Sequence, residues 1–230
     1  MLKRVLLIVG IIILALVLFE VFKLLELRSS VDRYASYWKG QASQGGEFNF
    51  VVIGDSAAQG IGASKPQLGY VGLLSTQISE ATGKRVHTVN LSVTGATVKD
   101  VLDKQLPQLK KYKADLIVVG IGSNNINKWD EKAFTDQYDQ LAKNLPKGTV
   151  VANIPYFGGR SRENDTAIKA SAVITDAAKR YDLELVDLQT YTAQHNSWRN
   201  YAADFFHPNN HGYRIWADAF WPVIKMELNR

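Results

Sequence analysis

The 230-residue chain has no cysteine and no low-complexity tract. The absence of cysteine excludes disulfide bonds, zinc sites built on cysteine and a thiol nucleophile. It is compatible with an exported bacterial protein. The chain also lacks a basic cluster: the formal net charge is only +5, and Lys and Arg are scattered. The pairs Lys110-Lys111 and Lys179-Arg180 are expected on solvated helix faces, so no nucleic-acid partner is predicted.

The N-terminus carries a long apolar run. Residues Val5 to Phe19 include no polar side chain, and Val21 and Phe22 extend the run past Glu20. At about 1.5 Å per residue, a helix over 5–22 is roughly 27 Å long, enough to cross the hydrocarbon core of a bilayer. The apolar residues surround the helix on all sides, which argues against a one-sided core helix.

The flanks of this run favour an uncleaved signal anchor. Residues 20–27 offer no small-residue cleavage site of the A-x-A type, so a cleaved signal peptide is the weaker interpretation. Lys3 and Arg4 favour a cytoplasmic N-terminus, although Lys23 and Arg28 lie on the other side. We predict a single-pass protein of a bacterial cell envelope, with its N-terminus cytoplasmic and the rest of the chain outside.

The segment that follows the apolar run is amphipathic and aromatic. Tyr34, Tyr37 and Trp38 lie in an amphipathic stretch, where they could sit at the membrane interface or pack on the domain. Both alternatives fit the pattern equally well. Three segments are predicted: an anchor at 1–28, a stalk or linker at 29–46 and a globular domain at 47–230.

The globular part alternates short apolar runs with helical stretches. This alternation is typical of a parallel sheet with helices on both faces. Strands are predicted at 48–53, 85–91, 116–121, 149–154 and 183–186. Helices are predicted at 67–82, 98–112, 131–145, 165–181 and 210–228.

Residues with catalytic chemistry follow successive strands. Ser56 follows the first strand, Gly95 the second and Asn124 the third. In open α/β sheets, ligands bind outside the carboxyl ends of the strands, so these residues are expected at one edge. His207 precedes the last helix and can reach the same edge on its loop.

A serine becomes nucleophilic only beside a base. His207 is the candidate base for Ser56, because Asp204, three residues earlier, can orient its ring. A capping or turn serine and a surface histidine are the alternatives. His211 invites a metal-pair interpretation with His207, but Pro208 and Gly212 interrupt a helix and no Glu lies between the histidines. No metal site is predicted.

Gly95 and Asn124 are candidate oxyanion donors. A glycine lets its backbone N–H approach the substrate closely, and an asparagine amide supplies a further N–H. Judged singly, a turn glycine and an Asx-turn asparagine would be the simpler interpretations. The joint pattern with Ser56 and His207 favours acyl-transfer chemistry.

Four blocks carry these residues, and they resemble those of the SGNH, or GDSL-type, hydrolase family, which has Ser, Gly, Asn and His in this order. The resemblance covers residues 48–225. The blocks read Gly54-Asp-Ser-Ala-Ala-Gln-Gly-Ile-Gly62, Asn90-Leu-Ser-Val-Thr-Gly-Ala-Thr97, Gly120-Ile-Gly-Ser-Asn-Asn125 and Asp204-Phe-Phe-His-Pro-Asn-Asn-His-Gly-Tyr213.

The resemblance implies a flavodoxin-like three-layer α/β/α sandwich with a five-stranded parallel sheet. It implies Ser56 as nucleophile, His207 as base with Asp204 as its partner, and an oxyanion hole made by the Ser56 N–H, Gly95 and Asn124. Family members hydrolyse esters or thioesters of lipids, small acids and acetylated sugars, and need no cofactor.

Two positions depart from the family pattern. Ala57 stands where leucine is common, and Asn125 stands where the third block usually has aspartate. The second exchange removes a charge beside Asn124 but keeps hydrogen-bonding capacity.

Substrate contacts are predicted from nearby polar and aromatic residues. Asn125, Tyr156, Phe157 and Trp129 are the candidates, and ordinary packing accounts equally well for the aromatic ones. The sequence therefore predicts a membrane-anchored serine esterase acting on an acyl lipid or an O-acetylated glycan. An acyltransferase of the same fold and a catalytically silent surface binding module are the alternatives, and the pattern does not indicate an oligomeric state.

Overall fold

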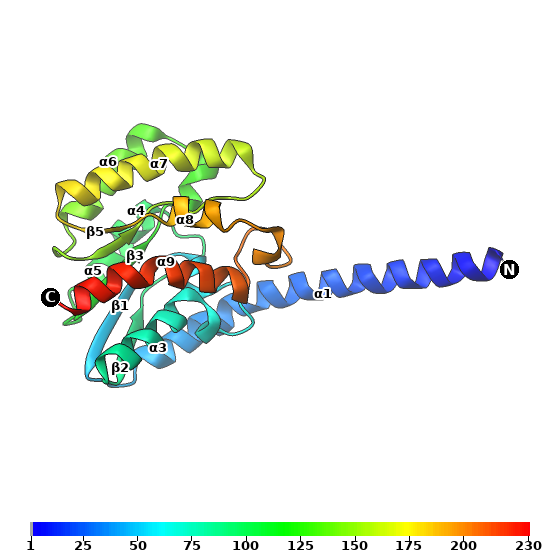
Figure 1. Cartoon of the computed structure of the whole chain (residues 1–230), viewed down its shortest axis with the longest axis horizontal. Coiled ribbons are helices and arrows are strands. Elements are labelled where there is room, and N and C mark those ends of the chain that lie inside the picture. Colours follow the sequence, from blue (N-terminus) through cyan, green and yellow to red (C-terminus); the bar gives the residue numbers. More distant parts are fainter. Residues whose placement is uncertain (1) are drawn as a thin grey trace.

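The computed structural model describes residues 2–230, so Met1 of the predicted anchor lies outside the described residues. A five-stranded parallel sheet forms the centre, with strand order β2-β1-β3-β4-β5 (Figure 1). This order is that of flavodoxin-like folds, which confirms the predicted fold class. The strands are β1 (Phe48–Gly54), β2 (Val86–Asn90), β3 (Leu116–Gly120), β4 (Val150–Ala152) and β5 (Glu184–Val186).

The central strands carry apolar side chains on both faces, and helices cover both faces of the sheet. Val51 and Ile53 of β1 join one buried cluster, whereas Phe50 and Val52 join the other. The first cluster includes residues of α4 (Val98–Asp100), α5 (Leu106–Leu109), α6 (Glu131–Lys143) and α7 (Ser161–Arg180). The second includes residues of α1 (Leu2–Ala42), α3 (Tyr70–Thr82), α8 (Leu188–Gln194) and α9 (Asn210–Leu228).

The predicted helix at 98–112 is interrupted. A π-helical turn, η2 (Val101–Gln105), separates α4 from α5, and the Leu106 N–H donates to the Val101 carbonyl. Pro107 has no N–H to continue an α-helical ladder, which accounts for the break. Four short elements were not predicted: α2 (Ser56–Gln59), η3 (Ser123–Lys128), α8 and η4 (Trp198–Asn200). A further 3-10 turn, η1 (Pro66–Leu68), precedes α3.

Helix α1 is one continuous helix that projects from the domain (Figure 1). Among the described residues it is the one helix long and apolar enough to cross a membrane, with a mean hydropathy of 2.7 and none of that window buried. Length and composition suit a membrane anchor and a signal sequence alike.

The C-terminal end of α1 packs on the domain. Tyr34 and Trp38 are buried; the Tyr34 hydroxyl donates to the Ala63 carbonyl at 2.6 Å, and Trp38 Nε1 donates to the Gln59 carbonyl at 2.9 Å. Residues 29–46, predicted as a stalk or linker, thus include two side chains that pack on the globular domain. Of the two alternatives for these aromatic residues, packing on the domain is observed for Tyr34 and Trp38.

Helix α1 runs antiparallel to the strands. Tyr34 contacts Ala63, beyond the carboxyl end of β1, whereas the carbonyl of Ala42 lies 3.1 Å from Nε2 of His87, near the start of β2. The projecting part of α1 therefore leaves the domain at the carboxyl edge of the sheet (Figure 1).

Candidate active site

The end of β1 positions Ser56 as the first residue of α2. Asp55 caps this short helix by accepting a hydrogen bond from the Ala57 N–H at 3.0 Å. The amide of Gln105 fixes the strand end, since it bonds the Gly54 N–H at 3.0 Å and the Gly54 carbonyl at 2.9 Å. A Cβ at Gly54 would lie 2.7 Å from that of Ala58 and 2.8 Å from the Gly120 carbonyl oxygen, so only glycine fits there.

Ser56, His207 and Asp204 form a continuous hydrogen-bonded chain. His207 Nε2 lies 2.9 Å from Ser56 Oγ, and His207 Nδ1 lies 2.6 Å from Asp204 Oδ2. With the Nδ1 proton directed at the carboxylate, Nε2 is left to accept the serine proton. The structure thus brings together three residues that are up to 151 positions apart in sequence.

Asp204 is held as a carboxylate by the turn that it begins. Its Oδ1 accepts the N–H groups of Phe206 and His207, both at 3.0 Å. Burial raises the pKa of Asp204, but the His207 ring and these two N–H groups outweigh burial, so the pKa lies below its ordinary value. The acid is therefore ionised when it orients the histidine.

The His207 loop needs a glycine beneath it. Gly62 has φ +98°, and a Cβ there would lie 2.4 Å from the Pro208 carbonyl oxygen and 2.9 Å from the His207 Cβ. The loop is closed further by the Ala202 N–H, which donates to the His207 carbonyl at 2.8 Å. Gly62 thus allows His207 to approach Ser56.

Asn124 lies in the same group, and Gly95 lies beside it. Asn124 Nδ2 donates to the Ala96 carbonyl at 2.9 Å and to Asp55 Oδ2 at 3.3 Å. Gly95, with φ 80°, precedes Ala96 and connects to Asn124 through that residue. Within residues 2–230, the backbone N–H groups of Ser56 and Gly95 have no hydrogen-bond acceptor. Unpaired N–H groups and a side-chain amide are the kinds of donor that a developing oxyanion needs.

Asp55 is a candidate site residue that the sequence analysis did not single out. It is buried, and burial raises its pKa to about 6 against the lowering effects of the Ala57 N–H and the nearby His207. Its position inside the Gly-Asp-Ser block was the available signal.

A cleft opens beside Ser56 and His207. Tyr156 and Phe157, predicted as substrate contacts, line it, and the Phe157 ring stacks on Phe206 with 6.0 Å between centroids. The other lining residues include Asp55, Ser123, Pro155, Thr192, Asn200, Tyr201, Phe206, Pro208, Ile215 and Trp216. Ile215 and Trp216 belong to α9, and no local motif marks such residues.

Asn125 and Trp129 do not line this cleft. Asn125 Oδ1 accepts the Val98 N–H at 3.2 Å, which ties η3 to the start of α4. Trp129 packs on Phe134 with ring centroids 5.0 Å apart. Both side chains therefore have contacts within the fold.

No group of three or more His, Asp or Glu side chains in residues 2–230 is placed to hold a metal ion. His211 lies at an exposed position near the start of α9.

Comparison with solved structures shows the same fold in several esterases. An acetylxylan esterase from Geobacillus stearothermophilus is 21% identical, with a TM-score of 0.64 over 78% of this chain and 95% of that chain. TesA is 22% identical, with a TM-score of 0.65 over 78% and 99%. A lipase/acylhydrolase from Enterococcus faecalis is 18% identical, with a TM-score of 0.64 over 79% and 96%.

A search of curated protein sequences gave no match. Residues 52–215, most of the globular domain, match the GDSL-like lipase/acylhydrolase family. Together with the fold, this match shows that the chain belongs to the GDSL-like lipase/acylhydrolase family of ester-hydrolysing enzymes.

Proposed function

We propose that the protein is a membrane-anchored serine esterase in which Ser56, His207 and Asp204 form the catalytic triad. The observation that carries this proposal is the unbroken chain from Ser56 Oγ to His207 Nε2 at 2.9 Å and from His207 Nδ1 to Asp204 at 2.6 Å. A buried serine in such a chain is activated for attack on a carbonyl carbon.

The reaction proceeds in two stages. Ser56 Oγ attacks the ester carbonyl while His207 Nε2 takes its proton. The tetrahedral oxyanion is stabilised by the N–H groups of Ser56 and Gly95 and by Asn124 Nδ2. His207 then donates its proton to the leaving alcohol, and the same ring later activates a water molecule that cleaves the acyl-enzyme.

Asn124 has to change partners during this cycle. Both hydrogens of its Nδ2 are directed at acceptors in the free enzyme, the Ala96 carbonyl and Asp55. The longer of these bonds, to Asp55 at 3.3 Å, is the one that an oxyanion would replace. The buried Asp55 is thus a positioning residue that holds the donor near the site before substrate arrives.

The apolar part of α1 supports the proposed location. We place this helix across a cytoplasmic membrane with the N-terminus inside and the catalytic domain outside. Lipid esters and O-acetylated envelope glycans are both within reach of such an enzyme. The related structures include an acetylxylan esterase and a lipase/acylhydrolase, which span the same two classes.

The test is ester turnover by the full-length protein in detergent, with p-nitrophenyl acetate, butyrate and octanoate as substrates. Wild-type turnover should vanish in Ser56→Ala. Product analysis with a glycan acceptor present separates hydrolysis from acyl transfer. Equal turnover by wild type and Ser56→Ala would refute the proposal, and ligand binding without turnover would favour a binding module.

A further inference from the structure

Two exposed aromatic residues lie on one loop next to the catalytic histidine. The side chains of Trp198 and Phe205 are 72% and 65% exposed. Outside α1, the other exposed large hydrophobic residues of the described chain are Val93, Ile168 and Met226, none of them aromatic. We call Trp198, Arg199 and Phe205 the aromatic rim.

The aromatic rim faces the part of α1 where the apolar run ends. A groove separates α1 from the rim; Glu20, Lys23 and Leu24 line it on the α1 side, and Trp198 and Phe205 line it on the other. A helix that spans the bilayer with residues 5–22 places the residues that follow, from Lys23 on, at the water interface. The rim therefore lies level with that interface, which is where Trp is enriched in membrane proteins.

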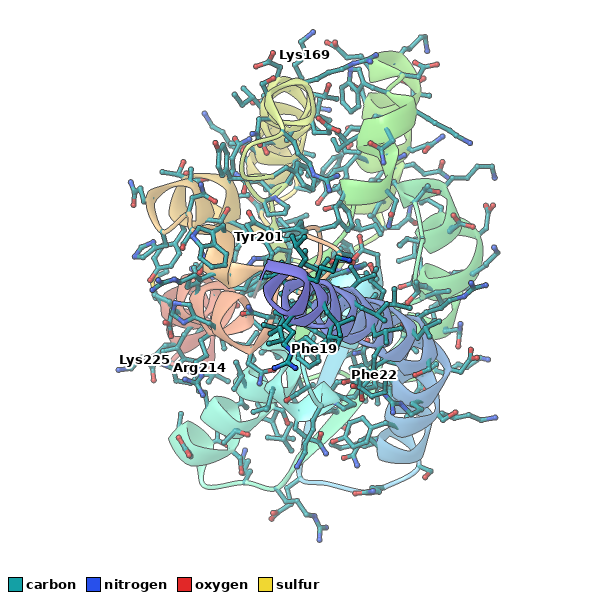
Figure 2. The ribbon with its side chains drawn as sticks, turned by 90° about the vertical axis from the view of Figure 1, so that its right-hand side faces the viewer. Phe19, Phe22, Lys169, Tyr201, Arg214 and Lys225 are labelled. Carbon is teal, nitrogen blue, oxygen red and sulfur yellow. The ribbon has the colours of Figure 1, made fainter. Side chains whose placement is uncertain are left out.

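The catalytic cleft opens toward the same side. Tyr201 lines both the cleft and the groove beside α1. Figure 2 views the molecule from the side on which α1 projects, and Tyr201 lies beside the projecting helix there. Because α1 leaves the domain at the carboxyl edge of the sheet, the active-site edge points along α1 toward the membrane (Figure 1).

The backbone at Phe205 directs this side chain outward. Phe205 has φ 52°, a left-handed conformation that is uncommon for a bulky residue. The bonds from the Phe206 and His207 N–H groups to Asp204 fix the turn. As a result, Phe206 lines the cleft, whereas its neighbour Phe205 is exposed beside the groove. Strain of this kind persists where the surrounding structure imposes it, often at functional sites.

Charge on the rim suits lipid headgroups. The Arg199 guanidinium lies 5.5 Å from the centroid of the Trp198 ring, and it forms no ion pair within residues 2–230. Across the groove, Lys23 and Arg33 are each paired with a glutamate. At the boundary between acyl chains and phosphates, the aromatic ring can contact the acyl chains while the adjacent guanidinium binds a phosphate.

We propose that the aromatic rim docks on the surface of the bilayer that α1 enters, and that the active site takes its substrate, an ester-bearing membrane lipid, from that leaflet. This inference rests on the proposed esterase function and names its substrate class. Docking would place the mouth of the cleft at the headgroup level, where a lipid ester can reach Ser56 by a short displacement out of the bilayer.

The docking is tested with the full-length protein in phosphatidylcholine–phosphatidylglycerol vesicles. Tryptophan fluorescence is measured with and without brominated phosphatidylcholine. The bromine atoms of this lipid quench the fluorescence of tryptophan rings that enter the bilayer. We expect quenching in the wild type, loss of a large part of it in Trp198→Ala, and wild-type quenching in the control Ile168→Ala/Met226→Ala. Identical quenching in all three proteins would overturn the docking.

The substrate class is tested in the same vesicles with two substrates: dioleoyl phosphatidylglycerol in the bilayer and p-nitrophenyl butyrate in solution. We expect Trp198→Ala to lower lipid-ester hydrolysis about tenfold, because an interfacial anchor is lost, and to change butyrate hydrolysis by less than about twofold. Trp198→Tyr, which keeps an interfacial aromatic residue, should restore lipid hydrolysis.

The outcomes separate the two proposals. Butyrate hydrolysis without any lipid hydrolysis overturns the lipid substrate and leaves the esterase standing. Equal lipid hydrolysis by wild type and Trp198→Ala overturns the role of the rim. Absence of turnover on every ester refutes the proposed function itself, and quenching still decides whether the rim contacts the membrane.

Discussion

Asn124 Nδ2 and Asp55 Oδ2 lie 3.3 Å apart, so the amide expected to stabilise an oxyanion is held by a buried carboxyl in the free enzyme. The carboxyl belongs to the residue before Ser56, the proposed nucleophile. Its second oxygen accepts the Ala57 N–H at 3.0 Å, which links the donor amide to the short helix that begins at Ser56.

Removing this donor should slow the chemical step. In Asn124→Ala we expect kcat to fall about 10²–10³-fold with little change in KM, because the bond to the oxyanion forms mainly in the transition state. Asp55→Asn should lower kcat less, about tenfold, since Asn124 then loses its positioning partner and not its N–H. Steady-state kinetics with p-nitrophenyl butyrate would measure both. A rise in KM at constant kcat would contradict the role.

The buried Asp55 should also shape stability as a function of pH. Burial raises its pKa from 3.8 to about 6 in the folded protein, so the folded state binds this proton more tightly than the unfolded chain. The resulting contribution to stability is fully present below pH 3.8 and is lost as pH rises through about 6.

We therefore expect wild type to lose about 2 kcal/mol of unfolding free energy relative to Asp55→Asn between pH 4 and 7. Groups that do not interact with Asp55 contribute equally in both proteins, so their effects cancel in the difference. Urea unfolding across this range would measure it, with the exposed Asp218→Asn as control. Parallel curves for wild type and Asp55→Asn would refute the expectation.

Gly62 offers a test of how the catalytic loop is seated. A Cβ would collide with the Pro208 carbonyl at 2.4 Å, and the residue has a positive φ of +98°. Gly62→Ala should lower the unfolding free energy by about 1–3 kcal/mol and displace His207, with a fall in kcat of at least about tenfold. Gly159→Ala is the matched control, because a Cβ added at Gly159 would have no neighbouring atom within 4 Å. Thermal unfolding and kcat of both variants decide the matter.

Asn125 tests the departure from the family block. Its Oδ1 accepts the Val98 N–H, and an aspartate could do the same. Asn125→Asp should therefore keep kcat within about twofold of wild type, whereas Asn125→Ala should cost about 0.5–1.5 kcal/mol of stability. Comparable losses in both variants, seen by kinetics and denaturant unfolding, would show that charge matters more than the acceptor.

The sheet was predictable because its strands are short and apolar. The predicted strand at 116–121 corresponds to Leu116–Gly120, and the predicted helix at 210–228 matches α9. The four blocks also identified residues that lie close together, because Ser56 and Asn124 each follow one of two strands that are neighbours in the sheet. Parallel strands bring such ends together whatever their separation in sequence.

Other features depend on contacts that no local pattern encodes. Tyr34 and Trp38 have the same spacing whether they face lipid headgroups or the sheet, and only the fold shows that they are buried. Trp129 near a catalytic block suggested a substrate contact, but Phe134 lies beside it. The cleft residues of α9 face the site through helix packing, and their sequence reads as an ordinary amphipathic helix.

The continuity of α1 sets the working distance of the enzyme. Tyr34, fixed to Ala63, and Phe22, at the end of the apolar run, are joined by helix without a break. Twelve residues of helix measure about 18 Å. If α1 anchors the protein as proposed, this helix holds the active site at a fixed height above the membrane, and a substrate farther out in the envelope would have to come to the enzyme. Inserting four helical residues directly after Ser29 would move the domain about 6 Å farther from the apolar run and rotate it by about 40° about the helix axis.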